Sequence, residues 1–299
     1  MEREQIYYQK YILKKDLVGG ADKKLEEVIK RQPGLSTGDF NGIVLGADGV
    51  SELTKHIPPT LETLDLSYTF VDGVEGARAI VSVLKKLKKL KTLNLSANTI
   101  GDEGATEIAD ALPPTLETLF LDSLQIEKDS AKAIAEKLLE LQSLKKLSLA
   151  SNNIGDVGAI AIANALPPTL ETLILNNNLI GDAGATAIAG ALPPTFETLV
   201  LYFNRIGNAG ATAIAKKLPE LQSLKYLDLR HNNIKDDGAD KIFENLISVK
   251  ALETLKLQYN YLSFIKILDW HNFELESINR PGNLKYERYE DILIPQKDE

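Results

Sequence analysis

Apolar residues recur along the chain in a nine-residue pattern that returns at nearly constant intervals. Leucine or a related apolar residue occupies the first, fourth and sixth positions of the pattern, and asparagine usually occupies the ninth. Subtracting neighbouring start positions gives spacings of 26 to 29 residues. Such a period predicts one body built from repeated structural units. The eight copies begin at Leu61, Leu90, Leu116, Leu144, Leu170, Phe196, Leu224 and Leu252.

The two halves of each copy have different periods. In the copy that starts at Leu170, Leu173 and Leu175 lie on one side of a predicted short strand. Apolar residues then follow at i, i+3, i+4 and i+7, which is typical of an amphipathic helix. One strand and one helix cannot bury a core alone, so the copies are expected to stack. Because helices are about 10 Å wide and strands lie about 4.8 Å apart, the stack should curve with its strands inside.

The pattern LxxLxLxxN resembles the leucine-rich repeat family, and its spacing resembles the ribonuclease-inhibitor-like class of that family. The resemblance covers residues 40–262, where a degenerate copy that starts at Phe40 precedes the eight regular copies. It implies an α/β fold: a right-handed solenoid or horseshoe, with a parallel β-sheet on the concave face and helices on the convex face. Terminal units of a solenoid need covering. Residues 1–39 are therefore predicted to form an N-terminal helical cap, and residues 263–299 a C-terminal cap and tail.

Asparagine at the ninth position follows each predicted strand, where its amide can bond backbone groups that have left the sheet. Thr69 and Leu124 replace it in two copies, and we expect local irregularity around Leu124. The predicted structural ladder consists of Asn98, Asn152, Asn178, Asn204, Asn232 and Asn260.

A second polar column stands directly before each helical stripe. A column of carboxylates could indicate calcium binding, but its place ahead of a Gly-Ala pair and a helix favours capping of the helix N-terminus. The column consists of Asp102, Asp156, Asp182, Asn208 and Asp236.

Composition excludes several classes of function. The 34 basic and 42 acidic side chains give a formal charge of −8, which argues against nucleic acid or an anionic membrane as partner. The absence of cysteine excludes disulfides, thiolate zinc sites and cysteine nucleophiles. No apolar run approaches the ~20 residues of a spanning helix, and the first residues do not resemble a signal peptide. We expect a cytoplasmic monomer with no membrane span.

No catalytic constellation is found among the side chains. The three histidines are scattered, and HExxH, GxSxG and the phosphate-binding GxxxxGK[ST] motif do not occur. His231 should have Phe203 and Tyr259 as lateral neighbours in adjoining copies, and neither is a nucleophile or a metal ligand pair. We therefore predict a protein that is not an enzyme and that uses no cofactor or metal.

The third, fifth, seventh and eighth positions of each copy are expected to face the concavity or its edge. Several of them are aromatic or apolar although folding does not require it, and aromatic residues and arginine are enriched at binding hot spots. The alternative is that these side chains pack on one another or under the C-terminal cap. The predicted partner-binding residues are Phe120, Ile174, Val200, Tyr202, Phe203, Tyr226, Asp228, Arg230, His231 and Tyr259.

These observations predict a scaffold for protein–protein interaction. Asp65, Asp122 and Asp228 make the rest of the predicted concave face acidic, so a partner with an apolar anchor and basic residues would fit. The Pro-Pro-Thr-Leu-Glu-Thr-Leu segments at 58–64 and 167–173 resemble leucine-rich repeat effectors that intracellular bacteria inject into host cells. Residues 287–294 resemble the acidic and hydrophobic tails of type IV secretion substrates. The resemblance implies a virulence factor that binds a host protein in the host cytoplasm.

A second hypothesis belongs to another class of function. Leucine-rich repeat proteins that activate a nuclear-transport GTPase share the horseshoe, and such activity usually involves an arginine or a water-positioning group near the γ-phosphate. The repeats contain Arg78, Arg205 and Arg230, and none of them belongs to a recognisable motif.

Overall fold

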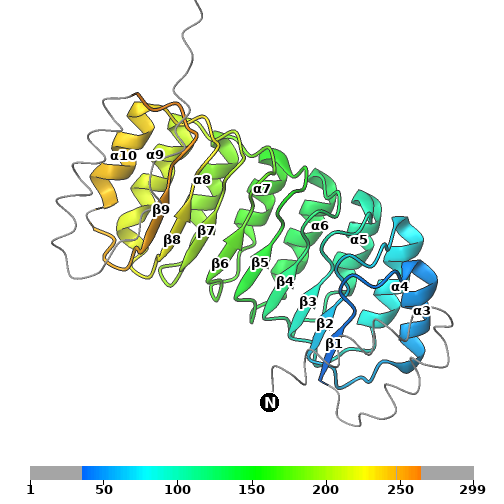
Figure 1. Ribbon diagram of the computed structural model, residues 1–299. Coiled ribbons are helices and arrows are strands. Elements are labelled where there is room, and N and C mark those ends of the chain that lie inside the picture. The colour runs from blue at the N-terminus through cyan, green and yellow to red at the C-terminus, as the bar shows by residue number, and fades with distance from the viewer. Residues whose placement is uncertain (1–35, 247, 264–299) are drawn as a thin grey trace, which may run out of the picture. The chain divides into compact units, whose positions relative to one another are not determined.

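The computed structural model describes residues 36–246 and 248–263, which fall into two compact units divided after Asn152. Short strands and helices alternate along each unit (Figure 1). Most of the predicted N-terminal cap and nearly all of the predicted C-terminal cap and tail lie outside the described residues.

In the first unit the elements follow the repeat. They are β1 (Thr37–Asp39), α3 (Gly46–His56), β2 (Thr63–Asp65), α4 (Gly73–Leu84), β3 (Thr92–Asn94), α5 (Gly101–Ala111), β4 (Thr118–Phe120), α6 (Lys128–Leu138) and β5 (Lys146–Ser148). The second unit continues the alternation and adds one short 3₁₀ helix. Its elements are α7 (Gly155–Asn164), β6 (Thr172–Ile174), α8 (Asp182–Ala191), β7 (Thr198–Val200), α9 (Asn208–Lys217), η1 (Leu218–Glu220), β8 (Tyr226–Asp228), α10 (Asp236–Leu246) and β9 (Thr254–Lys256).

Strands within each unit are parallel and pair at equivalent repeat positions. Leu93 of β3 stands beside Leu119 of β4, and Leu199 of β7 stands beside Leu227 of β8. In each unit the strands form one face and the helices lie behind them (Figure 1). The face formed by the strands is called the strand face below. The leucine-rich repeat fold predicted from the sequence is confirmed.

The core lies between strands and helices. Leu173 and Leu175 are fully buried from the strand side, and Ile188 and Ala189 are buried from α8. Burying such side chains stabilises the fold by roughly 1.5–3 kcal/mol for each large aliphatic group. The small alanines of the helical stripe let the helices pack close to the strands, so one copy fills its share of the core only against its neighbours.

The first copy differs in register from the prediction that starts it at Phe40. β1 precedes Phe40, and Asp39 pairs with Asp65 of β2. The Phe40 amide then donates to the Asp65 carbonyl oxygen at 2.8 Å. Phe40 therefore takes the sixth position of the pattern, where the next copy has Leu66. The sequence assignment was misplaced because a buried aromatic residue suits the first and the sixth position equally well.

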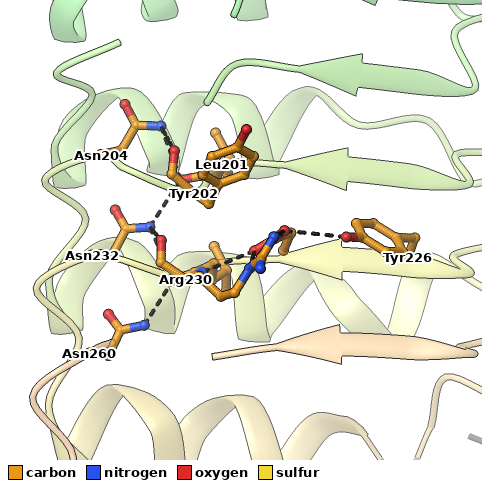
Figure 2. A network of polar contacts seen from close by, with 9 residues as sticks. Leu201, Tyr202, Asn204, Tyr226, Arg230, Asn232 and Asn260 are labelled. Carbon is orange, nitrogen blue, oxygen red and sulfur yellow. Dashed lines mark hydrogen bonds and ion pairs between the residues drawn. The ribbon is translucent and has the colours of Figure 1, made fainter. Parts of the chain in front are cut away.

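Each ladder asparagine joins two copies through its side-chain amide. Asn204 Nδ2 donates to the carbonyl oxygens of Leu175 and Leu201, both at 3.0 Å. Its Oδ1 accepts from the backbone amides of Asn178 and Ile180, also at 3.0 Å. Figure 2 shows the same arrangement continuing through Asn232 and Asn260. The asparagine thus satisfies backbone groups of its own turn and of the turn before it.

The expected irregularity around Leu124 is confined to the backbone, where Gln125 takes a φ of 63°, while the amides of the turn keep their hydrogen bonds. The amides of Leu124 and Ile126 both donate to Asn152 Oδ1 at 3.0 Å. The Leu124 carbonyl accepts from the Gly101 amide at 3.0 Å, and its side chain is buried in the core. The Oδ1 atom of a ladder residue accepts from the turn of the preceding copy, so the amides of the Leu124 turn have their acceptor in Asn152 and do not depend on the residue at position 124.

The acidic column caps helices, but its first four members each cap the helix of the following copy. Asp182 Oδ1 accepts from the amides of Gly207 and Gly210, at 2.7 and 2.8 Å, at the N-terminus of α9. Asn208 makes the same contacts with Lys235 and Gly238 at the start of α10. Glycine at position 210 permits this close approach, because a Cβ there would lie 2.8 Å from both Asp182 Oδ1 and Ile206 Cγ2.

Replacing Asp182 by alanine is expected to lower the free energy of unfolding by about 1–2 kcal/mol, because two amide donors at a helix N-terminus lose their acceptor. Asp182→Asn should cost clearly less, since Asn208 fills the same role with an amide oxygen. Urea denaturation of the two variants would measure the difference. An alanine variant as stable as the parent chain would contradict this account of the column.

Candidate functional site

The structure distributes the predicted partner-binding residues between the two units. Phe120 belongs to β4 of the first unit, where the Lys146 ammonium lies 5.0 Å from the centre of its ring. The other nine belong to β6, β7, β8 and the turns that follow β7, β8 and β9 in the second unit. The candidate contact surface is therefore the strand face of the second unit.

Three aromatic side chains stack in a row beside these strands. The ring centres of Phe203 and His231 lie 3.9 Å apart, those of His231 and Tyr259 lie 4.1 Å apart, and both pairs are tilted by only 9°. Phe203, His231 and Tyr259 are called the aromatic row below. The repeat spacing predicts these neighbours, since each residue occupies the eighth position of its copy.

The backbone explains why the three rings align. Phe203, His231 and Tyr259 have φ angles of 53°, 50° and 60°. This left-handed conformation is uncommon for residues other than glycine, asparagine and aspartate. Asn177, with φ 56°, occupies the same position one copy earlier. The turn can thus be built with a small polar residue, and the large rings are not required by the fold.

The aromatic row is packed internally and still exposed. Phe203 retains 51% and Tyr259 retains 40% of their accessible surface. The alternative in which these side chains pack on one another is therefore seen in part, and it leaves a large aromatic surface open. The other part of that alternative, in which these side chains pack under a C-terminal cap, concerns residues outside the described part of the chain.

A polar cluster anchors the surface next to the row. Arg230 Nε and Nη2 donate to Asp228 Oδ1 and Oδ2 at 3.0 and 2.7 Å. The Tyr226 hydroxyl donates to Asp228 Oδ2 at 3.3 Å, and the Arg230 guanidinium lies 5.3 Å from the Tyr202 ring centre (Figure 2). Asp228 is only 1% exposed. It lies beneath the surface and orients Arg230 and Tyr226, so it does not itself present atoms to a partner.

Burial and the neighbouring positive charge favour the neutral form of the His231 imidazole. Burial between its neighbours lowers the pKa of the His231 imidazole, the positive charge of Arg230 lowers it further, and Asp228 opposes both. Burial, followed by the charge of Asp228, raises the pKa of the Tyr226 phenol. At neutral pH the row therefore stacks as three uncharged rings beside one fixed guanidinium.

The described residues offer no group of three or more histidine or acidic side chains arranged to hold a metal ion. None of the helices in residues 36–246 combines the length and the apolar character that crossing a membrane requires.

Sequence reasoning missed one feature of the first unit. A hollow of about 290 Å³ opens on its strand face between β2, β3 and β4 and their following turns. Among its lining residues are Tyr68, Ser96 and Asp122. Their repeat positions place them on the face, but the space between them depends on side-chain sizes in four copies together.

The comparisons with known proteins agree with the repeat. A family model described as a leucine-rich repeat matches residues 86–109, 140–163, 167–189, 193–215 and 220–243. The ribonuclease inhibitor of Sus scrofa is 34% identical over 77 residues, which are 25% of this chain and 17% of that protein. The NACHT, LRR and PYD domains-containing protein 5 of Bos taurus is 31% identical over 134 residues, 43% of this chain and 12% of that protein. The chain thus matches less than a fifth of the length of these relatives.

Solved structures share the fold at lower identity. Internalin C2 from Listeria monocytogenes superposes with a TM-score of 0.50 and 21% identity, covering 83% of this chain and 96% of that one. A plant ice-binding protein also gives 0.50, with 22% identity over 77% of this chain and 66% of its own. The repeat pattern, the register of the strands and the matched relatives lead to one assignment. The chain carries leucine-rich repeats, and the relatives that it matches over part of their length include ribonuclease inhibitors.

Proposed function

We propose that this chain binds a partner protein through the strand face of its second unit. Leucine-rich repeats indicate a protein-binding scaffold. The observation that carries the choice of surface is the aromatic row, which stands exposed where the turn itself would accept asparagine.

Residue chemistry supports a hot spot at this surface. Tyr202 packs edge-on against Phe203 with ring centres 5.7 Å apart, and Arg230 lies over the Tyr202 ring. Tyrosine, tryptophan and arginine dominate the residues whose truncation costs more than about 2 kcal/mol of binding energy. Single exposed apolar side chains are normal on protein surfaces, whereas a contiguous cluster of them usually marks an interaction site.

The surface is also preorganised. The aromatic row is held by stacking, and Asp228 fixes the Arg230 guanidinium from below. Immobilising a flexible side chain on binding costs about 0.5–1.5 kcal/mol. Because these groups are already ordered, a partner would lose less entropy by docking here than on a surface of free side chains.

Affinity capture from eukaryotic cell lysate tests the proposal. The parent chain should retain a protein that the Tyr202→Ala/Phe203→Ala variant loses. The matched control is Val157→Ala/Ile160→Ala, which removes two exposed apolar side chains from α7 of the same unit. The control should retain the same protein. Identical lists from all three baits would contradict the proposed surface.

The variant is expected to remain folded. Phe203 is half exposed and Tyr202 is only partly buried, so the main loss is the stacking of Phe203 on His231. Aromatic pairs contribute about 0.5–1.5 kcal/mol beyond their buried area. A circular-dichroism melt of each bait would separate loss of binding from loss of structure.

The finer role as a bacterial effector is supported by sequence resemblance alone. The Pro-Pro-Thr-Leu-Glu-Thr-Leu segments carry it, while the tail at 287–294 lies outside the described residues. The likeness to internalin C2 concerns the fold. Type IV secretion and a host protein as partner stay predictions, and the identity of the captured protein would test the second of them.

The GTPase-activating alternative gains no support from Arg78 or Arg230. Arg78 pairs with Glu107 at 3.0 Å, and Arg230 is bound bidentately by Asp228. A guanidinium in such a pair would have to give up its carboxylate to reach a γ-phosphate. The absence of enzymatic activity and of a cofactor remains a prediction.

A further inference from the structure

The hollow in the first unit is a polar depression with two aromatic walls. Its volume is about 290 Å³, and Tyr68, Phe120, Ser96 and Asp122 are among its lining residues. Tyr68 keeps 60% of its surface exposed although its φ is 56°, a conformation that disfavours a large side chain. As in the aromatic row, a ring stands at the eighth position where the turn does not need one.

Three side chains of the polar lining are tied to one another and to Asp65 by hydrogen bonds. Asn94 Nδ2 donates to Asp65 Oδ2 at 3.2 Å, and Asn41 Nδ2 donates to Ser67 Oγ at 2.5 Å. The Ser67 hydroxyl in turn donates to Asp65 Oδ1. Among the described residues that line the hollow, Asp122 carries the one charged side chain.

Asp122 supplies the charge of the hollow. Its Oδ1 accepts from the Ala150 amide at 2.8 Å and from the Ser148 hydroxyl. Within residues 36–246 and 248–263, the hydrogen bonds to this carboxylate end on Oδ1, which leaves Oδ2 available. Asp65 adds a second carboxylate behind the lining, so an anionic ligand would be repelled.

We propose that this hollow binds a guanidinium group, the side chain of an arginine on the partner protein. A guanidinium has a positive charge, five donors in one plane and no acceptor, which complements the Asp122 carboxylate. It also stacks on aromatic faces more readily than an ammonium group does. The inference rests on the proposed function in one respect, namely that the arginine belongs to a protein partner.

The protein itself shows that this environment accepts a cation. The Lys146 ammonium lies 5.0 Å from the centre of the Phe120 ring. This contact places a positive charge against one aromatic wall, and the same charge lowers the pKa of Asp122 against the larger effect of burial. A guanidinium entering the hollow would compete with Lys146 for the same negative surface.

Titration of the full chain with N-acetyl-arginine amide, followed by amide NMR shifts at low ionic strength, tests the proposal. Saturable shifts are expected at Ser96, Ala97 and Ser123. The neutral isostere N-acetyl-citrulline amide should give none. Burial raises the pKa of Asp122, so binding of the arginine probe should weaken on acidification before an ordinary aspartate protonates.

Three variants sharpen the test. Asp122→Asn keeps an oxygen for Ala150 and Ser148 and should therefore fold, but it should bind the arginine probe at least tenfold more weakly. Asp110→Asn removes an exposed carboxylate of α5 and should change binding less than twofold. Lys146→Gln should strengthen binding severalfold because a competing cation is gone.

Equal binding of both probes, an unaffected Asp122→Asn variant, or the absence of saturable shifts would overturn the proposal. The titration uses no partner protein and concerns the first unit only. Its failure would leave the contact surface of the second unit untouched, while failure of the capture experiment would leave the titration result standing.

Discussion

Replacing Asn204 by alanine is expected to lower the free energy of unfolding by about 3 kcal/mol. The side chain makes four hydrogen bonds of 3.0 Å to backbone groups of two copies. Its removal leaves the amides of Asn178 and Ile180 without an acceptor at a buried place, where an unpaired polar group costs about 1–3 kcal/mol. Urea denaturation monitored by circular dichroism would measure the loss.

Asn233 provides the matched control for this prediction. It is exposed and lies next to the ladder residue Asn232 of the following copy. Asn233→Ala keeps its backbone bond to the Ile206 carbonyl and should change stability by less than about 0.5 kcal/mol. Similar losses in the two variants would mean that the ladder does not hold the copies together.

The Asp228–Arg230 pair is expected to respond asymmetrically to truncation. Arg230→Ala should cost about 3 kcal/mol because it leaves a carboxylate that is 1% exposed without its counter-ion. Asp228→Ala should cost less, about 2 kcal/mol, because the Arg230 side chain is 28% exposed and can turn toward water. Denaturation of each variant at neutral pH would establish the order.

The double variant completes the cycle. Removing both partners eliminates the unpaired charge, so its cost should fall short of the sum of the single losses by more than 1 kcal/mol. The exposed Lys241–Glu244 pair of α10 is the control, with an expected coupling below about 0.5 kcal/mol. A coupling equally small at Asp228 and Arg230 would show that the pair does not anchor the surface.

The repeat made the fold readable from sequence. Leucines such as Leu173 and Leu175 recur at fixed positions in every copy. The position of a residue that is ambiguous in one copy can therefore be assigned by aligning that copy with the others. The neighbours of His231 follow from the same spacing and are found where it places them. The copy that contains Phe40 is degenerate and does not align clearly with the others. The sequence places Phe40 at the first position of the pattern, and the strand pairing places it at the sixth.

Interactions between copies were harder to foresee. The pattern identifies Asp182 as a capping residue but does not say that the capped helix belongs to the next copy. Likewise, Leu124 is tolerated because Asn152 bonds its turn. The burial of Asp228 and the hollow beside Asp122 depend on how side chains of several copies fill space, which repeat position alone does not determine.

Hydrogen–deuterium exchange of the chain with and without its captured partner tests the central claim most directly. If the strand face of the second unit is the contact surface, the partner should slow exchange in the turns after β7, β8 and β9, around Phe203, His231 and Tyr259. Exchange along α8 and α9 on the opposite side should stay unchanged. Protection confined to those helices would contradict the account.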